Sequence, residues 1–196
     1  MVKHYYNLNK KRMIYFISSK KLDDEPEAIF LFDSNGNKLK TVKEIDMNNL
    51  EGLETICNNQ NPSSAFDDDS LIIFDDYEGI YNKKIGKFVE ILKNSILVCG
   101  RSRHLNCLIS CHTLNAGTFT KLQISECNKI VLFPKGLTKH AMNYYLKQYL
   151  NFNVDLIHKL LNLKSILTNK YPFLCINLKN ITKYYITNNE LGLIDA

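Results

Sequence analysis

Two adjacent carboxylates, Asp75 and Asp76, are the residues whose type and position most clearly suggest chemistry in this sequence. They follow a run of four apolar residues at 71–74. A carboxylate at the end of a stiff strand can hold a water of a magnesium shell, and a second carboxylate can orient an attacking water. The alternative is that both acids only leave the strand and cap the next helix.

The elements around this pair indicate where it would lie. Because the run at 71–74 shows no alternation of polar and apolar residues, it predicts a strand buried on both faces, as in a parallel sheet covered by helices. A polar loop at 63–70 precedes the strand, and apolar residues at helical spacing predict a surface helix at about 81–93. In open α/β sheets, ligands bind at the carboxyl ends of the strands, which is where the two acids are placed.

The rest of the chain supplies further strands and helices. Residues 1–12 resemble the tail of a helix that runs into a basic loop, and residues 43–70 are mostly polar and predict a loop with a short helix. The pair Asn35-Gly36 tolerates positive φ and predicts a hairpin over 28–42. Strands are predicted at 13–17, 105–111 and 129–133, helices at about 138–150 and 154–168, and a closing hairpin from 173–178 and 183–187. We expect the strand at 129–133 to be buried.

Length and composition limit the kinds of protein that this sequence can encode. The 196 residues suit one domain, and the net charge of +5 gives only a modest lean toward a polyanionic partner. The sequence has no signal peptide and no apolar run long enough for a membrane segment. Its six cysteines are scattered singly, which is typical of free thiols in a reducing compartment.

A cluster of cysteines and histidines at 99–112 raises the question of a zinc site. If 105–111 is a strand, Cys107 and Cys111 share a face but lie about 13 Å apart, at ~3.3 Å per residue. Zinc needs each sulfur about 2.3 Å from the metal, so one ion cannot take both. Buried free thiols are the favoured interpretation.

Four segments together resemble the genome-packaging ATPases of large DNA viruses, in the FtsK/HerA group of P-loop NTPases. They are Ile-Tyr-Phe-Ile-Ser-Ser-Lys-Lys-Leu-Asp-Asp at 14–24, Ser-Leu-Ile-Ile-Phe-Asp-Asp at 70–76, Arg-Ser-Arg-His-Leu-Asn-Cys-Leu-Ile-Ser-Cys-His at 101–112, and Lys-Ile-Val-Leu-Phe-Pro at 129–134. The resemblance spans about residues 5–190. It implies a three-layer, RecA-like α/β P-loop core over 1–196, with a mainly parallel sheet, a C-terminal helix pair and a β-hairpin.

The resemblance also implies roles for particular residues. Asp75 would bind Mg²⁺ as the Walker B acid, and Asp76 would act on the catalytic water. His112 would be the polar sensor near the γ-phosphate of ATP, at the tip of the next strand. Arg101 or Arg103 would be an arginine finger acting on a neighbouring subunit, or a DNA contact.

The sequence departs from this family because it contains no phosphate loop of the form G-x-x-x-x-G-K-[S/T]. The pair Gly86-Lys87 does not qualify, since no Ser or Thr follows it and it lies inside a predicted helix after the acidic pair. The family places the loop just before the helix whose tail is predicted at 1–9, so we expect that the first strand and the loop are missing. An interrupted or truncated gene is the favoured explanation, and a second polypeptide that supplies both is the alternative.

The expected function is therefore the core of a viral DNA-packaging ATPase that couples hydrolysis of ATP with Mg²⁺ to translocation of double-stranded DNA. The resemblance implies a homo-oligomeric ring, capsid or portal partners, and a location in the host cytoplasm or the virion. One alternative is a degenerate protein that binds DNA or a motor subunit without hydrolysis. A helicase-like motor is another. Lacking an interior strand, the isolated chain is expected to be poorly stable.

Overall fold

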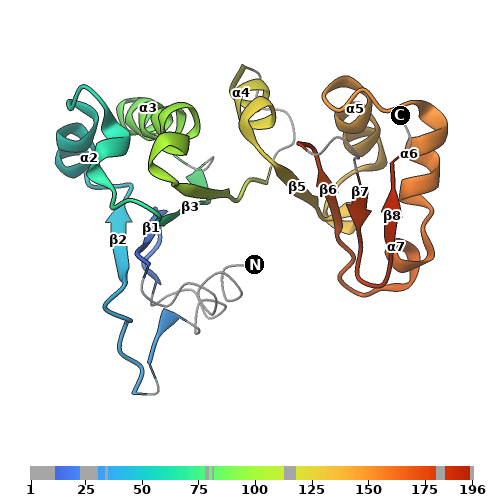
Figure 1. Cartoon of the computed structure of the whole chain (residues 1–196), viewed down its shortest axis with the longest axis horizontal. Coiled ribbons are helices and arrows are strands. Elements are labelled where there is room, and N and C mark those ends of the chain that lie inside the picture. The colour runs from blue at the N-terminus through green and yellow to red at the C-terminus, as the bar shows by residue number, and fades with distance from the viewer. Residues whose placement is uncertain are drawn as a thin grey trace. The chain divides into compact units, whose positions relative to one another are not determined.

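The computed structural model in Figure 1 describes residues 12–22, 31–33, 35–77, 80, 82–112, 118–179 and 184–194. Its internal contacts divide the chain into two compact units, Met1–His112 and Thr113–Ala196. The predicted helix tail before Arg12 and the residues 28–30 of the predicted hairpin lie outside the described residues. One P-loop domain over 1–196 stays a prediction.

The first unit is built on a four-stranded sheet in which every pair of neighbours is parallel. Its strand order is β2-β1-β3-β4. The strands are β1 (Ile14–Ser18), β2 (Val42–Asp46), β3 (Leu71–Asp75) and β4 (Asn106–Ile109). The sequence predicted β1, β3 and β4 at these places, and β3 has the predicted burial, with its first four residues buried.

Alternate side chains of the two central strands enter two separate hydrophobic clusters. Ile17 and Ile72 pack on one face with residues of α2 (Leu50–Cys57) and α3 (Lys83–Cys99). Phe16 and Ile73 pack on the other face, with Leu22 and Leu31 from the connection between β1 and β2. Since both faces are covered by apolar side chains, β1 is buried at all five positions.

The structure corrects several details of the first unit. Residues 42–46 form strand β2 instead of loop, because β2 lies at the edge of the sheet and only Val42 needs to be buried. The helix predicted to about residue 93 continues to Cys99, because Ile96 extends its buried stripe. Strand β4 ends at Ile109, before the predicted end at 111. The predicted turn at Gly36 is present, with φ of 78° and a bridge between Phe32 and Lys38.

The second unit contains a four-stranded antiparallel sheet in the order β5-β6-β7-β8. Its strands are β5 (Lys129–Leu132), β6 (Leu174–Asn177), β7 (Tyr184–Ile186) and β8 (Leu191–Leu193). Its helices are α4 (Thr118–Glu126), α5 (Lys139–Gln148), α6 (Val154–Leu161) and α7 (Lys164–Thr168). The helix predicted at 138–150 is confirmed as α5, and the β6–β7 hairpin is confirmed. The single helix predicted at 154–168 is wrong, because Leu163 leaves the helical conformation and divides the segment into α6 and α7. One face of the sheet packs against residues of α5, α6 and α7 in a single cluster.

Strand β5 is where the expectation for the second unit was wrong. It was predicted as a buried strand, but only Leu132 is buried and Lys129 is exposed. Among the described strands β5 pairs with β6 alone, in an antiparallel register, so it is an edge strand. The chain is thus mixed α/β, with one parallel and one antiparallel sheet.

Candidate functional site

The strand order of the parallel sheet marks one crevice as the place for a ligand. In the strand order, β2 lies next to β1 at one edge of the sheet, and β4 lies next to β3 at the other edge. The connection from β1 to β2 and the connection from β3 to β4 therefore run in opposite directions across the sheet. Residues between β1 and β2 pack on one face, whereas α3, which joins β3 to β4, packs on the other. The carboxyl ends of β1 and β3 therefore form a topological switch point, where open α/β sheets bind ligands.

Asp76 lies directly after β3 at this switch point. Its φ of 54° is left-handed, a conformation that an aspartate tolerates better than most residues. Its Oδ2 lies 3.0 Å from Nζ of Lys20, which follows β1. Its Oδ1 lies 2.5 Å from Nε2 of His112, which follows β4. Three loops of the same edge therefore meet at one carboxylate.

These contacts together lower the pKa of the Asp76 carboxyl group. The hydrogen bond from Lys20 contributes most to lowering the pKa of Asp76. Partial burial works in the opposite direction, and the hydrogen bond from His112 lowers the pKa further. The Asp76 side chain, which is 26% exposed, is ionised at neutral pH and accessible to a ligand.

Asp75 is the last residue of β3, and its Cα pairs with that of Ser18 across the sheet. Its neighbour Asp76 does not cap α3, because the side chain of Asn82 accepts the first amides of that helix. Asn82, and neither of the two acids, therefore caps α3, and the functional role of Asp75 and Asp76 stays a prediction. The two carboxylates are hard oxygen donors of the kind that Mg²⁺ prefers.

No group of three or more His, Cys, Asp and Glu side chains surrounds a possible metal position in the described parts of the chain. Magnesium bound through one or two carboxylates, with water and phosphate oxygens completing its shell, requires no such group. The residues present fit that mode, with Asp75 and Asp76 as the protein's oxygens.

The cysteines of the 99–112 cluster are free thiols, but the expectation that they are buried is wrong for Cys99 and Cys111, which are exposed. Cys107 is half-buried, and burial raises its pKa to about 12, with the charge of Lys93 opposing the rise.

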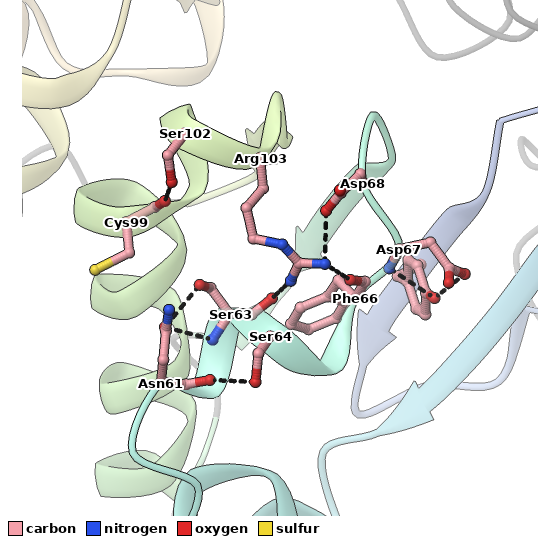
Figure 2. Close-up of polar contacts among 10 residues, drawn as sticks. Asn61, Ser63, Ser64, Phe66, Asp67, Asp68, Cys99, Ser102 and Arg103 are labelled. Carbon is pink, nitrogen blue, oxygen red and sulfur yellow. Dashed lines mark hydrogen bonds and ion pairs between the residues drawn. The ribbon is translucent and has the colours of Figure 1, made fainter.

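Arg103 has a different environment, shown in Figure 2. Its Nη1 donates to the carbonyl of Ser63 at 2.7 Å, and its Nη2 donates to the carbonyl of Phe66 at 2.8 Å. Nη2 also lies 2.6 Å from Oδ1 of Asp68. The guanidinium therefore ties the loop before β3 to η5 (Gly100–Arg103), the turn before β4.

The sequence analysis expects Arg101 or Arg103 to act on a neighbouring subunit or on DNA, and within this chain neither arginine lies beside Asp76. Arg101 and Arg103 precede β4, whereas Asp76 follows β3. Because the two strands are parallel, the arginines lie at the amino edge of the sheet and Asp76 lies at the carboxyl edge. Their role as an arginine finger or a DNA contact stays a prediction.

Lys20 is the site residue that sequence reasoning missed. It lies in the 14–24 segment of the resemblance, which implies no role for it. The available signal was a lysine directly after a buried strand, since parallel strands bring such positions to the same edge as the acids. The parallel pairing of β1 with β3 was needed to recognise it.

Comparison with known proteins gives one informative likeness. No protein-family model matches the chain. No solved structure matches it. The chain is 31% identical over 99 residues to a protein of the Sputnik virophage called "Uncharacterized protein V3". The match covers 50% of this chain and 40% of the virophage protein, so it spans less than half of that relative.

Among the described residues, no helix is both long enough and apolar enough to cross a membrane.

Proposed function

We propose that the chain is the catalytic-core portion of a viral DNA-packaging ATPase, which hydrolyses ATP with Mg²⁺ to move double-stranded DNA. The observation that carries this proposal is the position of Asp76 at the switch point, held between Lys20 and His112. A carboxylate beside a histidine and a lysine at the carboxyl edge of a parallel sheet suits the handling of a magnesium phosphate and of an attacking water.

Further support comes from the strand that carries the acids and from the likeness to a viral protein. Strand β3 lies between β1 and β4, so its end is fixed in position from both sides. A fixed strand can aim Asp75 at a metal shell with little reorganisation. The likeness to a virophage protein agrees with a viral origin.

The proposal requires a phosphate loop, which the printed sequence does not contain. Among the described strands, β4 pairs only with β3, and its opposite edge is available for another strand. A strand that carries the loop can join the sheet there, either from a preceding segment or from another polypeptide. A neighbouring subunit of a ring would supply an arginine to complete the site.

The test begins with sequencing of the transcript and of the DNA immediately upstream of the codon for Met1, to find whether they encode a phosphate loop. The product of the mapped transcript is then assayed for hydrolysis of ATP with Mg²⁺. We expect an in-frame phosphate loop and hydrolysis that falls at least about 100-fold in Asp76→Asn, with ATP binding retained. Asp155→Asn, at an acid in the first turn of α6, is the matched control and should keep full turnover.

Three results would overturn the proposal. They are unchanged turnover in Asp76→Asn, no hydrolysis by a product that carries the loop, and a transcript without the loop where no partner gene supplies it. The last result favours the second candidate, a protein that binds DNA or a motor subunit without hydrolysis. The specific observation behind this candidate is the absence of the loop from the printed sequence.

A further inference from the structure

The last residue of β1 and the loop that follows it, together called loop 18–21, combine two hydroxyls and two ammonium groups at the switch point, in Ser18, Ser19, Lys20 and Lys21. The backbone of this loop is held by three hydrogen bonds. The Lys20 amide donates to Oγ of Ser18 at 3.1 Å, and the Met47 amide donates to the Ser18 carbonyl at 2.9 Å. Nδ2 of Asn48 donates to the Ser19 carbonyl at 3.0 Å. The loop is therefore organised before any ligand arrives.

This loop borders a cavity of about 330 Å³. The cavity lies at the carboxyl ends of β1 and β2, and its lining includes the four loop residues and Asn48. Hydroxyl, amide and ammonium donors gathered around one cavity are suited to an oxyanion, because each can donate to an acceptor oxygen.

Two carboxylates also line the cavity, but both are engaged by the protein itself. Glu44 accepts the Leu22 amide at 3.2 Å and forms an ion pair with Lys38. Burial acts to raise the pKa of Glu44, yet the hydrogen bonds and the charges of Lys38 and Lys21 together lower it. Asp46 accepts the Asn48 amide at 2.8 Å. These contacts partly offset the repulsion that the acids would exert on an anion.

Lys20 reaches Asp76 from this loop, and its side chain is 53% exposed. A partly exposed ion pair of this kind is weak, because water screens it and ordering a long lysine side chain costs entropy. A polyphosphate carries more charge than one carboxylate, so it can compete for the same ammonium. Release of Lys20 would free Oδ2 of Asp76 for a metal shell or a water.

We propose that loop 18–21 is a phosphate-binding site. On ligand binding, the Lys20 side chain leaves Asp76, and its ammonium group pairs with a phosphate oxygen of the ligand instead. The inference rests on the proposed function for the identity of that ligand, a nucleoside triphosphate with Mg²⁺. Binding of phosphate and release of Asp76 are then coupled, so the acid becomes available only when the ligand is present.

The experiment is isothermal titration calorimetry of the full chain with tripolyphosphate, in EDTA to exclude Mg²⁺. We expect Lys20→Met to weaken binding about tenfold, through loss of one charge-assisted contact. Lys43→Met is the matched control, because Lys43 also pairs with an aspartate, Asp67, and its side chain is 56% exposed. Lys43→Met should bind within about twofold of the wild-type protein.

Three outcomes would overturn the inference: no binding by the wild-type chain, wild-type affinity in Lys20→Met, or equal weakening in both variants. Lys20→Arg should restore most of the affinity, which separates a lost contact from a misfolded variant. The two proposals fail differently. Tripolyphosphate binding without hydrolysis by the loop-carrying product would overturn the ATPase alone, whereas hydrolysis with an unchanged KM in Lys20→Met would overturn the phosphate role of Lys20 alone.

Discussion

The two edges of the parallel sheet use charged residues in opposite ways. Arg103 at the amino edge and Asp76 at the carboxyl edge have similarly exposed side chains, 27% and 26%. Arg103 is fixed by two backbone carbonyls as well as Asp68. Asp76, by contrast, forms ion pairs with two side chains, Lys20 and His112.

The difference separates a structural charge from one that can change partners. Backbone carbonyls of a buried turn must be satisfied in every folded molecule, so removing their donor costs stability. Side-chain ammonium and imidazole groups can rotate away without unfolding the chain. We therefore expect stability to depend on the amino edge and ligand binding to depend on the carboxyl edge.

Replacement of the arginine should have the largest effect on stability. Arg103→Met should lower the free energy of unfolding by about 2–4 kcal/mol, because it leaves the carbonyls of two buried residues, Ser63 and Phe66, without their donor. Urea denaturation measures this change. Arg101→Met, at an exposed position of the same turn, is the control and should cost less than about 1 kcal/mol. Equal losses in the two variants would contradict the structural role of Arg103.

A second variant, Tyr15→Phe, tests how much one side-chain hydrogen bond at the amino edge contributes to stability. The Tyr15 hydroxyl donates to Oδ2 of Asp67 at 2.6 Å, and this bond contributes most to lowering the pKa of Asp67. Tyr15→Phe should cost about 0.5–1 kcal/mol and raise the pKa of Asp67 toward its ordinary value. Urea denaturation and an NMR titration of the Asp67 carboxylate measure the two effects. An unchanged pKa of Asp67 in Tyr15→Phe would show that the Tyr15 hydroxyl is not what lowers this pKa.

The smallest stability effect is expected at the carboxyl edge. Asp76→Asn keeps the shape of the side chain and the preference for positive φ, so it should change the free energy of unfolding by about 0.5 kcal/mol or less at pH 7. The folded-state pKa of Asp76 is lowered, so any stabilisation is present above the ordinary aspartate pKa. It is lost as the pH falls through the lower folded value.

Stability curves of the wild-type protein and Asp76→Asn should therefore converge on acidification below about pH 4, where the charge of Asp76 is progressively lost. A difference that grows on acidification would contradict the lowered pKa. A loss at pH 7 as large as that of Arg103→Met would erase the distinction between the two edges.

The sequence was sufficient where a pattern is local. Four consecutive apolar residues predicted β3, and helical spacing predicted α3 and α5. It was insufficient where an element depends on its neighbours. Strand β2 has a polar sequence, Val-Lys-Glu-Ile-Asp, and becomes a strand because the edge of β1 accepts it.

The candidate site was likewise predictable only in part. The acids followed from the buried strand, and the structure places His112 against Asp76 as a shared site would require. Lys20 and the structural role of Arg103 could not be predicted, since both depend on which strands are parallel neighbours. Strand β5 was predicted as buried because its apolar composition does not distinguish an edge strand from a central one.

The most direct test of the central claim is an NMR titration of the ¹⁵N-labelled, loop-carrying product of the mapped transcript with Mg²⁺ and a non-hydrolysable analogue of ATP. The account predicts amide shifts in loop 18–21, at residues 75–77 and at His112, the loops that meet at the switch point. Shifts confined to the amino edge, around Ser63, Asp68 and Arg103, would contradict it. The absence of any shift at millimolar analogue would contradict it as well.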